Sequence, residues 1–201
     1  ALLCACRKRP VETQPTTDPS TVTTEPTTEA TEPTKETKPV AQYSHPLTGE
    51  LLEKPWQGQV ATIVINNIQD ALPQHGVSQA DMIYEIETEG GITRCVGIMT
   101  DPAKADAVGP IRSCRTYFLS LSVGYNAPLF HCGSSIYVDS NQYSISESVS
   151  AWDHVDEKGS SGYFYRDNNR YKNLGYDWEH TLFTSGSRLQ QALSGKAQSN
   201  F

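Results

Sequence analysis

The residues best suited to chemistry lie at 109–115, where a Gly-Pro pair precedes a predicted helix. This segment supplies two guanidinium groups, Arg112 and Arg115, on either side of Ser113. The first turn of a helix presents free backbone N–H groups, and arginine binds carboxylate or phosphate through two parallel hydrogen bonds. The pattern therefore predicts a binding site for an anionic group.

A third guanidinium, Arg94, follows a Gly-Gly turn and joins this site if its hairpin folds toward the same end of the sheet. The predicted ligand-binding residues are therefore Arg94, Arg112, Ser113 and Arg115. The alternative is a structural one, in which Arg112 forms an ion pair with Glu85 or Glu87. The sequence leaves both interpretations open.

A second group of residues could support nucleophilic catalysis. His131 precedes Ser134, and a carboxylate from segment 81–85, with Glu85 as the candidate, could orient the imidazole. Cys132 is a further candidate nucleophile, although neighbours on a strand point to opposite faces, which argues against a His131–Cys132 pair. The chain lacks the Gly-x-Ser-x-Gly, His-Glu-x-x-His and Ser-x-x-Lys patterns of known hydrolases, so a non-enzymatic role is favoured.

Composition excludes several classes of partner and cofactor. The net charge is −7, with no basic stripe to neutralise a phosphate backbone, which disfavours nucleic acid as a partner. The five cysteines and five histidines lack zinc spacing, and Asp167 begins a segment without the glycine and glutamate of a calcium loop. No metal or cofactor is predicted, and Cys95, Cys114 and Cys132 are expected to be buried or half-buried thiols.

The elements that position these residues follow from apolar periodicity. The segments 60–67, 128–132 and 179–183 are predicted strands, and 81–89 pairs with 92–99 in a hairpin with a two-residue Gly-Gly turn. In that hairpin, facing residue numbers sum to 181 and Glu87 faces Arg94. Helices are predicted from an N-cap at Ser113 to Gly124 and over 187–193. The fold class is α/β or α+β, a layered domain with a mixed sheet.

The N-terminal part of the chain has a different character. Residues 1–6 end in Leu3-Cys4-Ala5-Cys6, which looks like the end of a lipoprotein signal peptide with Cys6 as the lipidated residue. Residues 7–43 are rich in Thr, Pro and Glu and are predicted to form a disordered stalk. Residues 44–201 form the predicted globular domain, and no apolar run reaches the ~20 residues of a membrane-spanning helix.

Several short motifs occur in an order that resembles the YerB-like lipoproteins of Gram-positive bacteria, a family of unknown function. They are His45-Pro46-Leu47-Thr48-Gly49, Val64-Ile65-Asn66-Asn67, residues 79–85, residues 89–94, residues 108–113, and His131 with Gly133-Ser134. Cys114 and Cys132 stand where other small residues are expected. The resemblance covers residues 44–201 and implies the N-terminal domain of such a lipoprotein, truncated before a second domain.

These observations predict a binding or accessory lipoprotein of the cell envelope, anchored to the outer face of the membrane through Cys6. Its expected ligand is an anionic group of a wall polymer, a peptidoglycan peptide or a partner protein. Two alternatives remain: an envelope hydrolase or transferase that uses His131 with Ser134 or Cys132, and a scaffold for another envelope protein.

Overall fold

The computed structural model describes residues 43–135, 148–150, 155–156 and 162–195. The predicted lipidation site at Cys6 and the predicted stalk up to residue 42 lie outside these ranges, as does most of the polar segment 136–161. No helix in the described ranges is long and apolar enough to cross a membrane.

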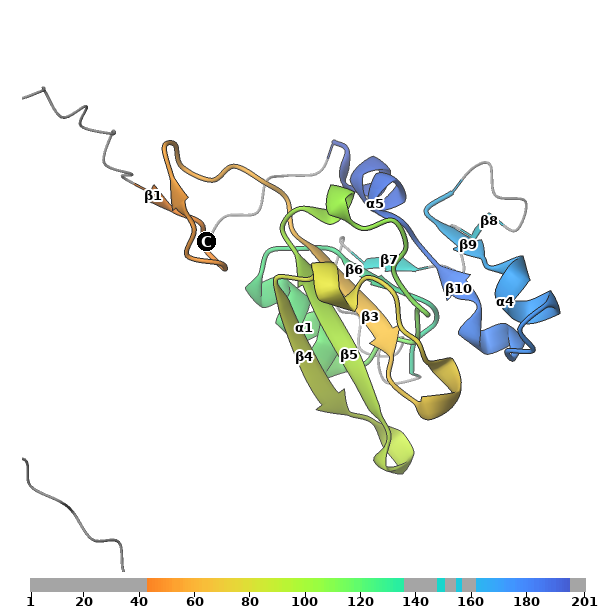
Figure 1. The fold of residues 1–201 in the computed structure, drawn as a ribbon. Coiled ribbons are helices and arrows are strands. Elements are labelled where there is room, and N and C mark those ends of the chain that lie inside the picture. The colour runs from red at the N-terminus through yellow and green to blue at the C-terminus, as the bar shows by residue number, and fades with distance from the viewer. Residues whose placement is uncertain (1–42, 136–147, 151–154, 157–161, 196–201) are drawn as a thin grey trace, which may run out of the picture. The chain divides into compact units, whose positions relative to one another are not determined.

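A five-stranded mixed sheet forms the centre of the fold, with strand order β4-β5-β3-β6-β7 (Figure 1). β5 is antiparallel to both β3 and β4, whereas β6 is parallel to β3 and β7. Its strands are β3 (Ala61–Asn66), β4 (Met82–Glu87), β5 (Thr93–Met99), β6 (Leu129–His131) and β7 (Ser148–Ser150). The mixed α+β prediction is confirmed.

Two small sheets and three helices complete the described structure. One sheet pairs β1 (Tyr43–Ser44) with β2 (Leu51–Leu52), and the other has the order β10-β9-β8, from β8 (Val155–Asp156), β9 (Phe164–Arg166) and β10 (Leu182–Phe183). The helices are α1 (Thr116–Gly124), α4 (Asn168–Lys172) and α5 (Gly186–Leu193). Short 3-10 helices cover Gln69–Ala71, Val77–Gln79, Glu89–Gly91, Pro102–Lys104 and Trp178–His180.

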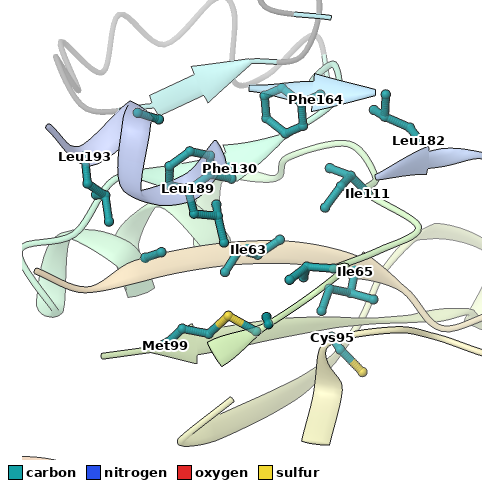
Figure 2. Close-up of a cluster of buried hydrophobic side chains, with 14 residues drawn as sticks. Ile63, Ile65, Cys95, Met99, Ile111, Phe130, Phe164, Leu182, Leu189 and Leu193 are labelled. Carbon is teal, nitrogen blue, oxygen red and sulfur yellow. The ribbon is translucent and has the colours of Figure 1, made fainter. Parts of the chain in front are cut away.

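Both faces of the central sheet are covered, so β3 is buried along its whole length. On one face, Ile63 and Ile65 pack with Phe130 and with Leu189 of α5 (Figure 2). On the other face, Val64 packs in a second cluster that includes Phe118 of α1. Continuous apolar sequence is typical of a strand that is buried on both sides. The sheet is therefore the middle layer of the fold.

The hairpin register differs from the prediction by one residue. Arg94 faces Ile86, and Glu87 faces Thr93, so facing residue numbers sum to 180. The connection is longer than a two-residue turn, because Glu89–Gly91 form a 3-10 helix and Thr88 N–H donates to Ile92 O over 2.7 Å. Side chains alternate along a strand, so this shift places Arg94 and Glu87 on opposite faces.

Candidate anion-binding site

The segment 110–114 is held in extended form at the end of β3. Asn66 N–H donates to Pro110 O over 2.8 Å, and Arg112 N–H donates to Val64 O over 3.0 Å. Gly109, with φ +151°, begins this path, and a Cβ there would lie 2.8 Å from Phe183 Cδ1. A larger residue would therefore push the arginine-bearing segment away from β10.

Residues 112–114 run parallel to residues 132–134. Cys132 N–H donates to Arg112 O over 3.0 Å, Cys114 N–H donates to Gly133 O over 2.9 Å, and Cys114 forms a parallel bridge with Ser134. This pairing keeps Ser113 extended, so the N-cap of α1 is Arg115 and the prediction of Ser113 as N-cap is wrong. It also brings the two predicted groups of functional residues side by side.

Arg94 is buried beneath this segment, with 5% of its surface exposed. Its Nη1 donates to Ser113 O over 2.6 Å, and its Nε has no hydrogen-bond partner among the described residues. Burial and, to a smaller extent, the like charges of Arg115 and Arg112 together lower the pKa of Arg94 to about 10. Arg94 therefore remains a cation at neutral pH in an environment with an excess of positive charge.

Arg115 contacts the tip of the hairpin through two parallel hydrogen bonds. Its Nε and Nη2 donate to the two carboxylate oxygens of Glu89, each over 2.7 Å, and its Nη1 donates to Cys114 O over 2.7 Å. The hydrogen bond from Arg115 is the main reason that the pKa of Glu89 falls from 4.5 to about 2. Glu89 therefore occupies the position where an external carboxylate would bind Arg115.

Arg112 belongs to a different environment. Its Nη1 donates to Glu179 Oε2 over 2.9 Å, so the predicted structural pairing with Glu85 or Glu87 is wrong. It lines a pocket of about 200 Å³ together with Cys132, Arg166 and Trp178. The structure therefore groups Arg94, Ser113 and Arg115 at the start of α1, and directs the Arg112 side chain elsewhere. We call this group the α1-start site.

The predicted catalytic residues are only partly brought together. The buried His131 places Nδ1 2.8 Å from Gly133 O, so Nδ1 carries the proton that is donated to this carbonyl. Glu85 instead accepts hydrogen bonds from Asn67 over 2.9 Å and Thr93 over 2.7 Å. Two strands separate β4 from β6, a distance of roughly 14 Å at ~4.8 Å per strand, so Glu85 does not orient His131.

Residues 47–199 match the model of the family described as "Protein of unknown function (DUF3048) N-terminal domain". The chain belongs to this family. Over 91 residues it is 41% identical to "Putative lipoprotein YerB" of Bacillus subtilis (strain 168). The aligned segment covers 45% of this chain and 27% of that protein.

The crystal structure of the YerB protein from Bacillus subtilis has a similar fold. The TM-score is 0.63 at 27% identity, and the match covers 79% of this chain and 52% of that one. The matches therefore cover about half of the solved relative's chain and about a quarter of the length of the lipoprotein relative. The predicted resemblance to YerB-like lipoproteins is confirmed, and with it the relation of this DUF3048 domain to a putative lipoprotein of unknown function.

Among the described residues, Cys95, Cys114 and Cys132 are thiols outside any disulfide and are buried or half-buried, as predicted. Cys95 and Cys114 are buried and Cys132 is half-buried. Burial raises the pKa of Cys132, although Arg166 and Arg112 act in the opposite direction. Within the described ranges, no group of three or more His, Cys, Asp or Glu side chains is arranged to hold a metal ion.

Three charged residues of the site were missed by sequence reasoning: Glu89, Arg166 and Glu179. Glu89 lies 26 residues from Arg115 and Glu179 lies 67 residues from Arg112, so no helical or strand spacing connects the partners. The sequence pattern predicts Glu89 only as the last residue of the strand 81–89 and as part of the motif at residues 89–94. The negative charge of Glu89 could have indicated this contact, because a carboxylate at a hairpin tip can reach a guanidinium at the start of a helix.

Proposed function

We propose that this domain binds an anionic group at the α1-start site, as a lipid-anchored binding or accessory protein outside the cytoplasmic membrane. The observation that carries the binding proposal is Arg94. A buried cation is normally matched by a carboxylate, yet Arg94 has no ion pair among the described residues and has two arginines near it. An incoming anion would supply the missing negative charge.

The surrounding geometry suits a carboxylate or phosphate. Arg115 already presents its Nε and Nη2 to a carboxylate, Glu89, whose side chain is 66% exposed and can move aside. The first N–H groups of α1 lack intrahelical partners and add donors at the same place. Glu89 therefore stands in for the ligand in the unliganded protein, and a stronger anion displaces it.

The proposed ligand class is an anionic group of a wall polymer, a peptidoglycan peptide or an envelope protein. The test is thermal unfolding at constant ionic strength with inorganic phosphate, acetate or N-acetyl-D-alanyl-D-alanine as probes. We expect a saturable rise in Tm with at least one probe, since a ligand that binds only the folded state stabilises it. A response to phosphate would indicate that the ligand is a phosphate group of a polymer. A response to the dipeptide would indicate a peptide carboxylate.

Arg94→Met should abolish the rise in Tm with acetate and with N-acetyl-D-alanyl-D-alanine, and should reduce the rise with phosphate. The matched control is Arg170→Met, which removes another buried arginine that bonds only to backbone carbonyls. If Arg170→Met keeps the response and Arg94→Met loses it, binding at the α1-start site is supported. Equal responses in wild type and Arg94→Met would refute the proposal.

Membrane anchoring through Cys6 is supported by the Leu3-Cys4-Ala5-Cys6 motif and by the lipoprotein name of the relative. Metabolic labelling of the full-length product with an alkyne fatty acid is the direct test. Label should appear in the wild type and in Cys132→Ser, and should disappear in Cys6→Ser. Label that persists in Cys6→Ser would contradict the assignment.

A further inference from the structure

A second cationic feature adjoins the α1-start site at Ser113 and has different guanidinium groups. The pocket of about 200 Å³ is bordered by Arg112, by Arg166 from β9, and by the 3-10 helix Trp178–His180. Its lining among the described residues includes two guanidiniums and one carboxylate, Glu179, so these described residues carry a net positive charge. Neither the family description nor the relative's name assigns a role to it.

Arg112 is only partly occupied by its protein partner. One of its terminal nitrogens donates to Glu179, while its buried Nε has no hydrogen-bond partner among the described residues. The Glu179 side chain is 54% exposed. An exposed carboxylate gains little from an ion pair, roughly 0–1 kcal/mol, so another anion can replace it without a large penalty.

Arg166 is held in a fixed orientation. Its Nη1 donates to Trp178 O over 2.7 Å, and its guanidinium carbon lies 4.7 Å from the centre of the Trp178 ring. A guanidinium that is already ordered loses little conformational entropy when it binds an anion. Arg166 therefore provides a preorganised cation on the wall of the pocket.

Cys132 lines the same pocket as Arg112 and Arg166. Both guanidiniums act electrostatically on its thiol. Because burial has the larger effect on its pKa, the thiol stays protonated at neutral pH and does not neutralise the arginines. The described residues of the pocket therefore keep a net positive charge. The rate at which the Cys132 thiol is alkylated can report on ligand binding there.

We infer that this pocket binds a phosphate group between Arg112 and Arg166, with Glu179 displaced toward solvent. Two guanidiniums from separate segments can share the oxygens of a tetrahedral anion, whereas a carboxylate offers only two oxygens. This site shares Ser113 with the α1-start site but uses different guanidinium groups, so Arg166→Met and Arg94→Met distinguish the two proposals.

The experiment measures alkylation of Cys132 by N-ethylmaleimide in the full chain, at constant ionic strength, with peptide-resolved mass spectrometry. Inorganic phosphate should slow Cys132 labelling in a saturable way, while acetate at equal concentration should not. Cys95 and Cys114 are buried and serve as internal references, whose rates should not respond to phosphate. Equal protection by acetate would overturn the assignment to phosphate.

Four variants locate the effect. Arg166→Met and Arg112→Met should raise the half-protecting phosphate concentration by about tenfold, as expected for one lost charged hydrogen bond. Glu179→Gln, a change at an exposed side chain that does not threaten folding, should lower it. Arg94→Met should leave it unchanged. The inference fails if phosphate does not protect Cys132, or if Glu179→Gln weakens the protection.

Discussion

Two buried arginines, Arg94 and Arg170, show how differently the same side chain can be accommodated. Arg170 donates to Ala71 O over 2.6 Å and to Pro73 O over 2.9 Å, and its guanidinium lies 4.0 Å from the Tyr176 ring centre. Within the described part of the chain, the Arg94 side chain donates to Ser113 O alone, and it lies near two like charges. The Nε of each arginine lacks a hydrogen-bond partner among the described residues. The two side chains therefore differ in the contacts of their terminal nitrogens.

The contacts of the two arginines indicate different roles, one structural and one in binding. Arg170 joins the 3-10 helix Gln69–Ala71 to α4, and both of its terminal nitrogens and its flat face make contacts. Arg94 is buried at a similar level, but it has one hydrogen bond among the described residues and lies near two like charges, which the more distant carboxylate of Glu89 offsets only in part. A buried charge without compensation reduces stability, and such sites are typical of functional regions. We therefore assign a structural role to Arg170 and a binding role to Arg94.

The largest effect is expected for Arg170→Met. The change removes two hydrogen bonds and leaves the carbonyls of Ala71 and Pro73 without these donors, which should lower the free energy of unfolding by about 3 kcal/mol. Urea unfolding monitored by tryptophan fluorescence measures it. A loss below about 1 kcal/mol would show that Arg170 is not a structural residue of this kind.

A smaller effect is expected for Arg94→Met. The lost hydrogen bond to Ser113 O is offset because a desolvated cation beside Arg115 and Arg112 is also removed. The free energy of unfolding should change by no more than about 1 kcal/mol in either direction. The same urea experiment checks this, and a loss as large as that of Arg170→Met would remove the distinction between the two arginines.

The smallest effect is expected for Glu89→Gln, which removes the charge that Arg115 binds. The folded-state pKa of Glu89 is about 2, below its ordinary 4.5, so its contribution is complete above pH 4.5 and is lost as the pH falls toward 2. Because Glu89 is exposed, we expect about 0.5 kcal/mol at neutral pH. Stability measured from pH 7 to pH 2 should show the wild type and the variant converging at the acidic end. Curves that stay parallel would contradict this.

Local sequence patterns predicted the elements of the fold well. The β-branched run at 60–67 became β3, and α1 ends at Gly124 as expected. Both depend on neighbours in sequence, where apolar periodicity and a stop signal are sufficient. The hairpin was placed correctly, but its register was not, because Gly90 and Gly91 with φ of 76° and 72° belong to a longer connection that includes Glu89.

The candidate site was predictable only in part, for the same physical reason. The grouping of Arg94, Ser113 and Arg115 followed from residue types near a helix start. The direction of Arg112 did not, because it depends on Glu179, 67 residues away. Tertiary partners of charged side chains leave no periodic trace in the sequence, so geometry was needed to divide one predicted arginine cluster into two environments.

The most direct test of the account is the behaviour of the arginine Nε–Hε signals in an NMR titration with inorganic phosphate. At constant ionic strength, the Arg94 signal, assigned with Arg94→Met, should move and saturate, because a bound anion provides the hydrogen-bond acceptor that Nε lacks. The Arg170 signal should stay in place. An Arg94 signal that does not move, or that drifts without saturation in parallel with Arg170, would contradict the binding role of the α1-start site.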